Sequence, residues 1–96
     1  MVKKEIIWSR RTKEDLGLIW DHAAENFSVQ KADEVTKGIV DQVGALSSFP
    51  RQGAISKDFF EIRELVVEGN VVFYRIMEER IVVAAIRPRR TNLKTF

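Results

Sequence analysis

The sequence predicts an α+β fold in the order β-α-α-β-β-β, in which a helical hairpin packs on a small antiparallel sheet. Two observations predict it: apolar residues recur at helical spacing in the first half of the chain, and from Arg51 onward they form short β-branched runs. The change of period falls at Pro50, and 96 residues suffice for one hydrophobic core. We therefore expect residues 1–96 to form a single domain.

The chain opens with an expected strand and an expected helix. The segment from Lys3 to Ser9 is rich in β-branched and aromatic residues before a polar break, which is typical of a strand. Thr12, followed three residues later by Asp15, resembles a capping box at a helix start. The helix itself is indicated by an apolar stripe at the 3.6-residue period, formed by Leu16, Ile19, Trp20, Ala23 and Phe27.

A second helix is expected from Ser28, its N-cap, to the residues just before Pro50. Phe27, which precedes the cap, is expected to pack on Ala32 as a hydrophobic staple. Because almost no loop joins the two helices, they form an antiparallel hairpin. Gly38 and Gly44 lie within the helical pattern, and each lowers helix stability by about 1 kcal/mol relative to alanine. They indicate either close packing against a neighbouring element or a locally weaker helix.

The second half of the chain predicts three strands. They run from Phe59 to Val67, from Val71 to Met77 and from Arg80 to Ile86. Gly69 provides a turn residue that takes positive φ readily, whereas the Glu78-Glu79 turn has no favoured sequence. Short connections make these strands an antiparallel meander, and the sheet face opposite the helices is either wet or meets a partner.

Composition excludes several classes of function. The chain has no cysteine, so disulfide scaffolds, cysteine-ligated zinc and thiol nucleophiles are excluded. The single histidine, His22, is expected at the surface of the first helix, and it has no companion ligand for a metal. No apolar run approaches the roughly 18–20 residues of a membrane span. We expect a cytoplasmic domain with no membrane contact, no cofactor and no metal.

Positive charge is concentrated near the end of the sequence. From Arg80 onward there are five cations and no acid, a pattern that favours a polyanion or an acidic protein partner unless it is only solvated surface. Within this stretch, Arg87-Pro88-Arg89-Arg90 is the strongest functional candidate. Its proline ends the last strand and leaves the arginines in extended chain, where guanidinium groups suit phosphates and carboxylates alike.

Other side chains have a structural reading beside a functional one. Tyr74 is expected in the core with its hydroxyl bonded to a partner. Arg63 lies two residues from Glu61 on the expected strand, so the two side chains share a face, and a cross-strand ion pair is the structural alternative to target binding. The two tryptophans, Trp8 and Trp20, are expected to anchor the core.

Several short segments occur along the chain in an order that resembles a known protein family. They are Trp8-Ser9-x-x-Thr12, Asp15-Leu16, Ala32, Leu46…Pro50-x-x-Gly53, Ile62-Arg63-Glu64-Leu65, Val72-Phe73-Tyr74-Arg75-Ile76 and Ile86-Arg87-Pro88-Arg89-Arg90. Their order and spacing resemble the RelE/ParE toxin superfamily of type II toxin–antitoxin modules over nearly the whole chain. The Arg-Glu-Leu strand, eleven residues before the Tyr-Arg pair, is most similar to the ParE branch, also called plasmid stabilisation proteins.

The resemblance implies one of two activities. RelE-like members are ribosome-dependent mRNA endonucleases, whereas ParE-like members poison DNA gyrase without cutting nucleic acid themselves. Cleaving RNA through its 2′-hydroxyl requires a base, an acid and cations, which RelE-like members supply from the open sheet face and the C-terminal region. This chain instead has Glu61 and Glu64 there, Val71 where the nucleases carry an arginine, and no tyrosine or histidine near Phe96. The ParE-like activity is therefore favoured.

The resemblance implies a toxin that binds gyrase, is not an enzyme, and forms a heteromeric complex with a cognate antitoxin. The candidate target contacts are Arg63, Arg87, Arg89, Arg90, Lys94 and Phe96. The candidate antitoxin contacts are Leu18, Arg75 and Arg87. Two alternatives stay open: a RelE-like endonuclease acting on mRNA at the ribosome, with the same arginines stabilising charge, and an inactive relic retained for its antitoxin complex.

Overall fold

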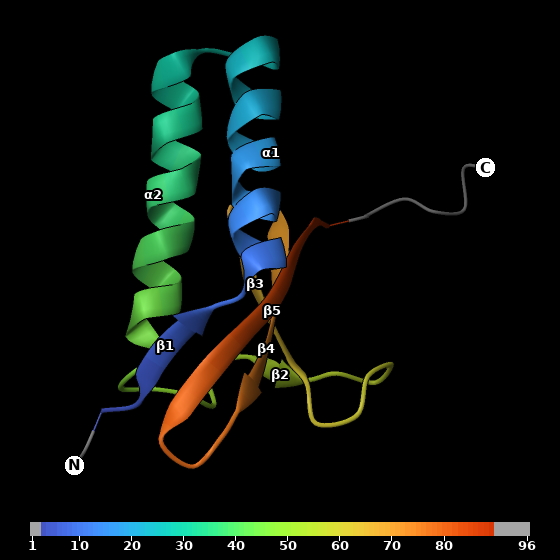
Figure 1. The fold of residues 1–96 in the computed structure, drawn as a ribbon. Coiled ribbons are helices and arrows are strands. Elements are labelled where there is room, and N and C mark those ends of the chain that lie inside the picture. The colour runs from blue at the N-terminus through green and yellow to red at the C-terminus, as the bar shows by residue number, and fades with distance from the viewer. Residues whose placement is uncertain (1–2, 90–96) are drawn as a thin grey trace.

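The computed structural model describes residues 3–89 and contains two helices and a five-stranded sheet. The elements are β1 (Glu5–Trp8), α1 (Arg10–Asn26), α2 (Val29–Ala45), β2 (Ala54–Ile55), β3 (Arg63–Val67), β4 (Asn70–Ile76) and β5 (Arg80–Pro88). The helices form a hairpin on one side of the sheet (Figure 1). The predicted α+β fold, the helical hairpin and the antiparallel β3–β4–β5 meander are confirmed.

The sheet differs from the prediction in being mixed. Its strand order is β1-β5-β4-β3-β2, and β1 pairs with β5 in parallel, with Ile6 opposite Ile81. The helical hairpin returns the chain to the end of the sheet where β1 began, so the chain enters the meander from the far edge. The backbone N–H of Lys4 donates to the Ser47 carbonyl (3.1 Å), and Ser47 Oγ donates to the Lys4 carbonyl (2.6 Å). These two bonds hold the start of β1 against the end of α2.

A second difference lies before β3, where the prediction of a strand from residue 59 is wrong. Residues 56–62 form a loop, and the strand begins at Arg63. Ser56 Oγ accepts from the backbone N–H groups of Asp58 and Phe59, both at 3.1 Å, so the side chain replaces a strand ladder with a turn. Glu61 then takes φ 60°, a left-handed conformation that no regular strand contains.

The core lies between the helices and the inner face of the sheet. Its fully buried members include Ile39 and Val43 of α2 and the C-cap residue Leu46, which pack with residues of β3, β4 and β5. Trp8 is half-buried against this cluster, as predicted. Trp20 is half-buried but lies outside the cluster, so its expected core role is wrong. It joins the helices instead, because its Nε1 donates to Asp33 Oδ1 at 2.9 Å.

Some of the expectations about the start of α2 and its two glycines are confirmed, and others are wrong. Ser28 is the N-cap of α2, as predicted, and its Oγ accepts from the Lys31 N–H. Phe27 is 72% exposed at the tip of the hairpin, so the expected staple on Ala32 does not form. A Cβ at Gly38 would meet Glu68 Oε2 at 2.8 Å, so this glycine permits close packing of α2 on the β3–β4 turn. No such contact exists at Gly44.

The first turn of α1 begins earlier than the sequence indicated. The N-cap is Ser9, whose Oγ accepts from the Thr12 N–H at 3.1 Å. The expected capping box of Thr12 and Asp15 is therefore wrong, because Thr12 already lies in the third helical position. Both side chains bind β5 instead: the fully buried Thr12 Oγ1 donates to the Val83 carbonyl (2.7 Å), and Asp15 Oδ2 accepts from the Ile86 N–H (3.0 Å).

These contacts fall where β5 has an irregularity. Tyr74 lies opposite Val83 but Phe73 lies opposite Ala85, so Ala84 has no partner on β4 and forms a β-bulge. The side chains of α1 satisfy backbone groups beside this bulge that a regular ladder would otherwise engage. We name this set of contacts, from Ser9, Thr12 and Asp15 to residues 83–86, the helix–bulge contact.

Replacing Thr12 by valine is expected to lower the free energy of unfolding by about 1–2 kcal/mol. Valine keeps the shape of the side chain, but the buried Val83 carbonyl loses the shorter of its two hydrogen bonds and keeps only the Ser9 N–H at 3.3 Å. Urea unfolding measured by circular dichroism tests this. The matched control is Thr36→Val, since Thr36 Oγ1 bonds only within its own helix, to the Ala32 and Asp33 carbonyls. Equal stability of the two variants would contradict the proposed importance of the Thr12 hydrogen bond.

Candidate interaction site

A groove runs between α1 and the end of the sheet where the β3–β4 turn meets β5. Its volume is about 760 Å³, within the roughly 300–1,000 Å³ of ligand pockets. Leu18, Ile19 and Ala23 of α1 line one side, and Ile86 of β5 lies opposite. Leu18 is 66% exposed although it is apolar, which distinguishes it from the core residues of the same helix. We call this feature the α1 groove.

Three cations border the α1 groove. They are Arg11 at the start of α1, Lys31 in the first turn of α2 and Arg87 near the end of β5. The Arg11 Nε lies 4.0 Å from Asp15 Oδ2, at the outer limit for an ion pair, and that oxygen already accepts from Ile86. Arg87 forms no ion pair within residues 3–89. Two acids, Asp15 and Glu68, also line the groove, so its margin carries an excess of cations around an apolar surface, which suits an acidic amphipathic partner.

The predicted site residues Arg63 and Arg75 lie away from the α1 groove. Both line a separate cavity of about 410 Å³ near the β4–β5 turn. The expected pair of Arg63 with Glu61 does not form, because Glu61 lies in the loop before β3. Arg75 Nη2 instead contacts Glu61 Oε1 at 2.7 Å, and Arg63 Nη1 donates to the Gly53 carbonyl at 2.7 Å. Their roles toward a target or an antitoxin stay predictions.

Tyr74 joins β4 to the loop that contains Pro50 and Gly53. The ring is fully buried, and its hydroxyl donates to the Pro50 carbonyl (2.7 Å) and accepts from the Gly53 N–H (2.8 Å). The predicted core position and satisfied hydroxyl are thus confirmed. Burial raises the pKa of Tyr74, opposed by the Gly53 hydrogen bond and the charge of Arg63. A Cβ at Gly53 would lie 2.7 Å from the hydroxyl, so only glycine fits there.

Of the other residues considered as site candidates, some lie within the described part of the chain and some lie outside it. Arg89 is exposed just after β5, and its backbone N–H donates to the Gly69 carbonyl at 2.9 Å. Arg90, Lys94 and Phe96 lie outside the described residues. His22 is exposed on α1 beside Asn26, as expected, and lines the α1 groove.

Sequence reasoning missed Arg11 and Lys31 as members of the cationic margin. Each belongs to a helix, and nothing in its local sequence shows that it borders a groove shared with the end of β5. The structure brings the predicted pair Leu18 and Arg87 together in one groove. Within residues 3–89, no cluster of three potential metal ligands exists, and neither helix is long and apolar enough to cross a membrane.

The fold and this groove define a small α+β domain with a surface suited to binding another protein. The chain matches the family model described as the ParE toxin of the type II toxin–antitoxin system, parDE, over residues 6–93. It therefore belongs to the ParE toxin family of type II toxin–antitoxin systems.

A solved structure supports the same assignment. The chain is similar to a structure described as the chromosomal ParDE toxin–antitoxin system from P. aeruginosa, with a TM-score of 0.82 and 25% sequence identity. The alignment covers 92% of this chain and 98% of that chain, so the two share nearly the whole fold. A search of curated protein sequences finds no match.

Replacing Tyr74 by phenylalanine is expected to cost about 1–3 kcal/mol of stability at pH 7, because two buried backbone groups lose their partner. The raised pKa adds a pH signature. The unfolded tyrosine ionises near its ordinary value of about 10, before the native one does, so the Tyr74 contribution is complete below that pH and declines above it. Urea unfolding at pH 7 and above about pH 10 should show the gap between wild type and variant narrowing. A gap that widens would contradict this account.

Proposed function

We propose that this ParE-family protein arrests growth by binding DNA gyrase, and that a cognate antitoxin neutralises it by occupying the α1 groove. The observation that carries the proposal is the groove itself, an apolar surface with Leu18 exposed and Arg11, Lys31 and Arg87 at its margin. Family membership supports the toxin role. The description of the similar structure as a ParDE system supports an antitoxin as one partner.

An amphipathic acidic segment fits the α1 groove best. A helix laid in a groove buries side chains spaced three and four residues apart, and the row formed by Leu18, Ile19 and Ala23 offers a matching apolar surface. Acidic residues flanking that apolar stripe would meet the three cations. Such margin contacts guide the encounter and set specificity, while the apolar centre provides most of the affinity.

Binding, without bond cleavage, is the activity that the described residues favour. A nuclease needs a group that protonates the leaving oxygen beside its phosphate-binding cations. Tyr74 does not meet this need, because its hydroxyl is buried and bonded on both sides. His22 lies on α1 and borders the groove, away from the open sheet face. Glu64 is a carboxylate on that open face, where its charge disfavours the binding of a phosphate.

We expect the purified protein to inhibit gyrase supercoiling, and we expect Arg87→Ala to raise the inhibitory concentration about tenfold. That factor corresponds to one charge-assisted hydrogen bond of about 1.4 kcal/mol. Lys37→Ala is the matched control, because Lys37 is an exposed cation on α2 that contacts only Asp41. A plasmid supercoiling assay with gyrase and a toxin titration measures the inhibitory concentration of the wild type and of the two variants.

The outcome that contradicts the gyrase proposal is normal supercoiling at a large excess of folded toxin. Translation-dependent mRNA breaks in expressing cells, lost in Arg89→Ala, would establish the endonuclease alternative, in which the arginines stabilise charge. Growth arrest with intact transcripts and a DNA damage response supports gyrase. Harmless expression of the folded protein would indicate the inactive relic.

Replacing Leu18 by glutamate is expected to leave the toxin folded and toxic but to remove its neutralisation. The side chain is exposed, so folding is not affected, while the new carboxylate lies in the apolar centre of the groove. Growth is scored with the toxin co-expressed with the small protein encoded by the adjacent gene. Val40→Glu, at an exposed position on α2 outside the groove, is the control. Full rescue of both variants would place the antitoxin elsewhere.

A further inference from the structure

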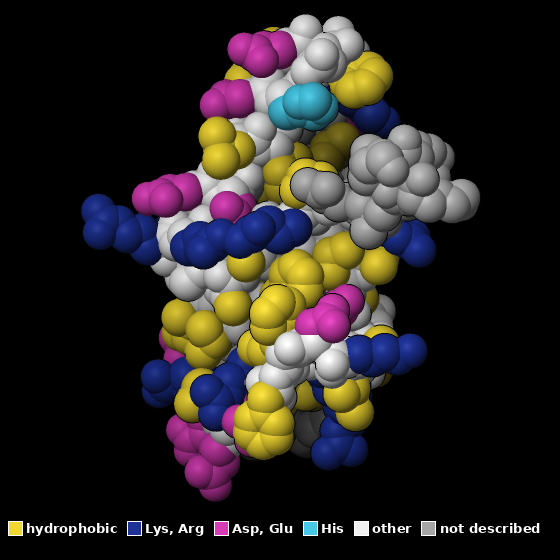
Figure 2. Space-filling view, turned by 90° about the vertical axis from the view of Figure 1, so that its right-hand side faces the viewer, with side chains coloured by type: hydrophobic (Ala, Val, Ile, Leu, Met, Phe, Trp, Pro, Cys, Tyr) yellow, Lys and Arg dark blue, Asp and Glu magenta, His cyan; other side chains and the backbone are white. Residues whose placement is uncertain are grey.

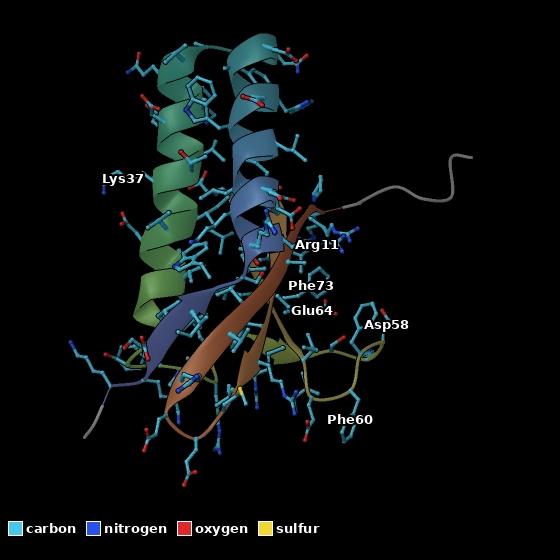
Figure 3. All side chains as sticks on the ribbon, viewed as in Figure 1. Arg11, Lys37, Asp58, Phe60, Glu64 and Phe73 are labelled. Carbon is cyan, nitrogen blue, oxygen red and sulfur yellow. The ribbon has the colours of Figure 1, made fainter. Side chains whose placement is uncertain are left out.

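A second hollow lies on the sheet face opposite the helical hairpin. Its volume is about 380 Å³, and its apolar lining comes from Phe59, Ile62, Phe73, Ala84 and Ala85. Figure 2 shows hydrophobic side chains gathered in the middle of this side of the molecule, with Lys and Arg side chains above them. In Figure 3, Arg11 and Phe73 lie on the same side of the sheet as the loop that carries Phe60. We call this feature the open-face pocket.

The pocket results from the β-bulge in β5. The unpaired Ala84 and its neighbour Ala85 are both half-buried, so two consecutive small side chains border the hollow beside the ring of Phe73. Larger side chains at these positions would fill the space, as they do in an ordinary sheet. Bulges often redirect side chains beside binding sites, and here the bulge creates the floor.

The wall of the pocket is preformed. Phe59 packs edge-to-face on Phe73, with ring centroids 5.9 Å apart. The loop that carries Phe59 is held by Ser56, whose backbone N–H donates to the Ile62 carbonyl at 2.8 Å and whose Oγ accepts from Phe59. The Arg75–Glu61 ion pair holds the loop where the backbone is left-handed. A preformed wall lowers the entropy cost of binding.

Two cations stand at the mouth of the pocket. Arg11 and Arg87 line it, although both also border the α1 groove on the other side. Within the described residues neither guanidinium has a close counter-charge, since the Asp15 contact with Arg11 is 4.0 Å long. Glu64, opposite Phe73 on β3, is a carboxylate of this face that does not line the pocket. The mouth of the pocket is therefore lined by two cations, and the nearby carboxylate of Glu64 lies outside it.

We propose that the open-face pocket binds a protein segment that inserts one apolar side chain between Phe73 and the alanines and presents neighbouring carboxylates to Arg11 and Arg87. The apolar floor accepts a side chain, and the two guanidinium groups match carboxylates. A run of phosphates fits less well, because the floor is apolar and gives a phosphate backbone nothing to bind beyond the two guanidinium groups at the mouth. This inference goes beyond the proposed function, since it holds whichever protein supplies the segment.

The test uses a defined probe, the peptide acetyl-Asp-Asp-Phe-Asp-Asp-amide, titrated into the ¹³C-methyl-labelled full chain and followed by NMR. The methyl signals of Ala84 and Ala85 are expected to shift, while that of Ala32 in the core does not. A peptide with Ala in place of Phe, and one with Asn in place of Asp, should each bind at least about fivefold more weakly. That factor is the order expected when a surface ion pair or a small apolar contact is lost.

Substitutions distinguish the contribution of the pocket floor to peptide binding from that of the two arginines at its mouth. Ala85→Ile should abolish peptide binding, because isoleucine fills the hollow; isoleucine also favours strands, and both arginines stay in place. Arg11→Gln and Arg87→Gln should each weaken binding about fivefold and reduce its sensitivity to salt. Val66→Ile, on the same face but outside the pocket, and Lys37→Gln, on α2, are the matched controls. Unchanged amide spectra away from each substitution establish that the variants are folded.

Four results would overturn the proposal. They are the absence of methyl shifts up to millimolar peptide, shifts confined to residues of the α1 groove, equal binding by Ala85→Ile, and shifts of Ala84 and Ala85 produced by a penta-uridylate but not by the peptide. Methyl shifts that depend on protein concentration without peptide would assign the face to a second copy of the chain instead. None of these readouts involves gyrase, so a failed supercoiling test and a failed pocket test are distinguishable.

Discussion

The helix–bulge contact is the interaction on which the rest of this structure depends. Ser9, Thr12 and Asp15 bind backbone groups of β5 at a bulge, and they do so from the N-cap and the first two turns of α1. The contact fixes the end of the helix on the sheet without a long loop. It also places Arg11, within the first of these turns, next to Arg87, one residue after Ile86. Both cavities take Arg11 and Arg87 from this one arrangement, and the α1 groove has Lys31 of α2 in addition.

The shared border has a consequence for how the toxin is neutralised. A guanidinium group that turns toward a carboxylate in the α1 groove is not available to a carboxylate at the open-face pocket. Under the proposals made above, an antitoxin in the groove therefore weakens binding on the opposite side of the sheet without covering it. The two sites are coupled through two side chains, and no conformational change of the fold is required for the coupling.

The helices and the meander were predictable from the sequence, because hydrophobic period and turn residues are local signals. The parallel placement of β1 and the loop at residues 56–62 were not, since they depend on edge pairing and on the Ser56 side chain. Leu18 and Arg87 were predicted as interaction residues and lie in one groove. Arg11 was missed, and Thr12 and Asp15 were assigned to a capping box, because their true partners lie about 70 residues away in β5.

The most direct test of this account is the hydrogen exchange of the Ile86 amide, measured by NMR in the native protein. Its N–H is bonded to a carboxylate of α1 beside an irregular part of the sheet, so ordinary strand pairing is not what protects it. If the helix and the bulge form one unit, this amide exchanges only on global unfolding and becomes much faster in Asp15→Ala. Rapid exchange in the wild-type protein, at the rate of a loop amide, would contradict the account.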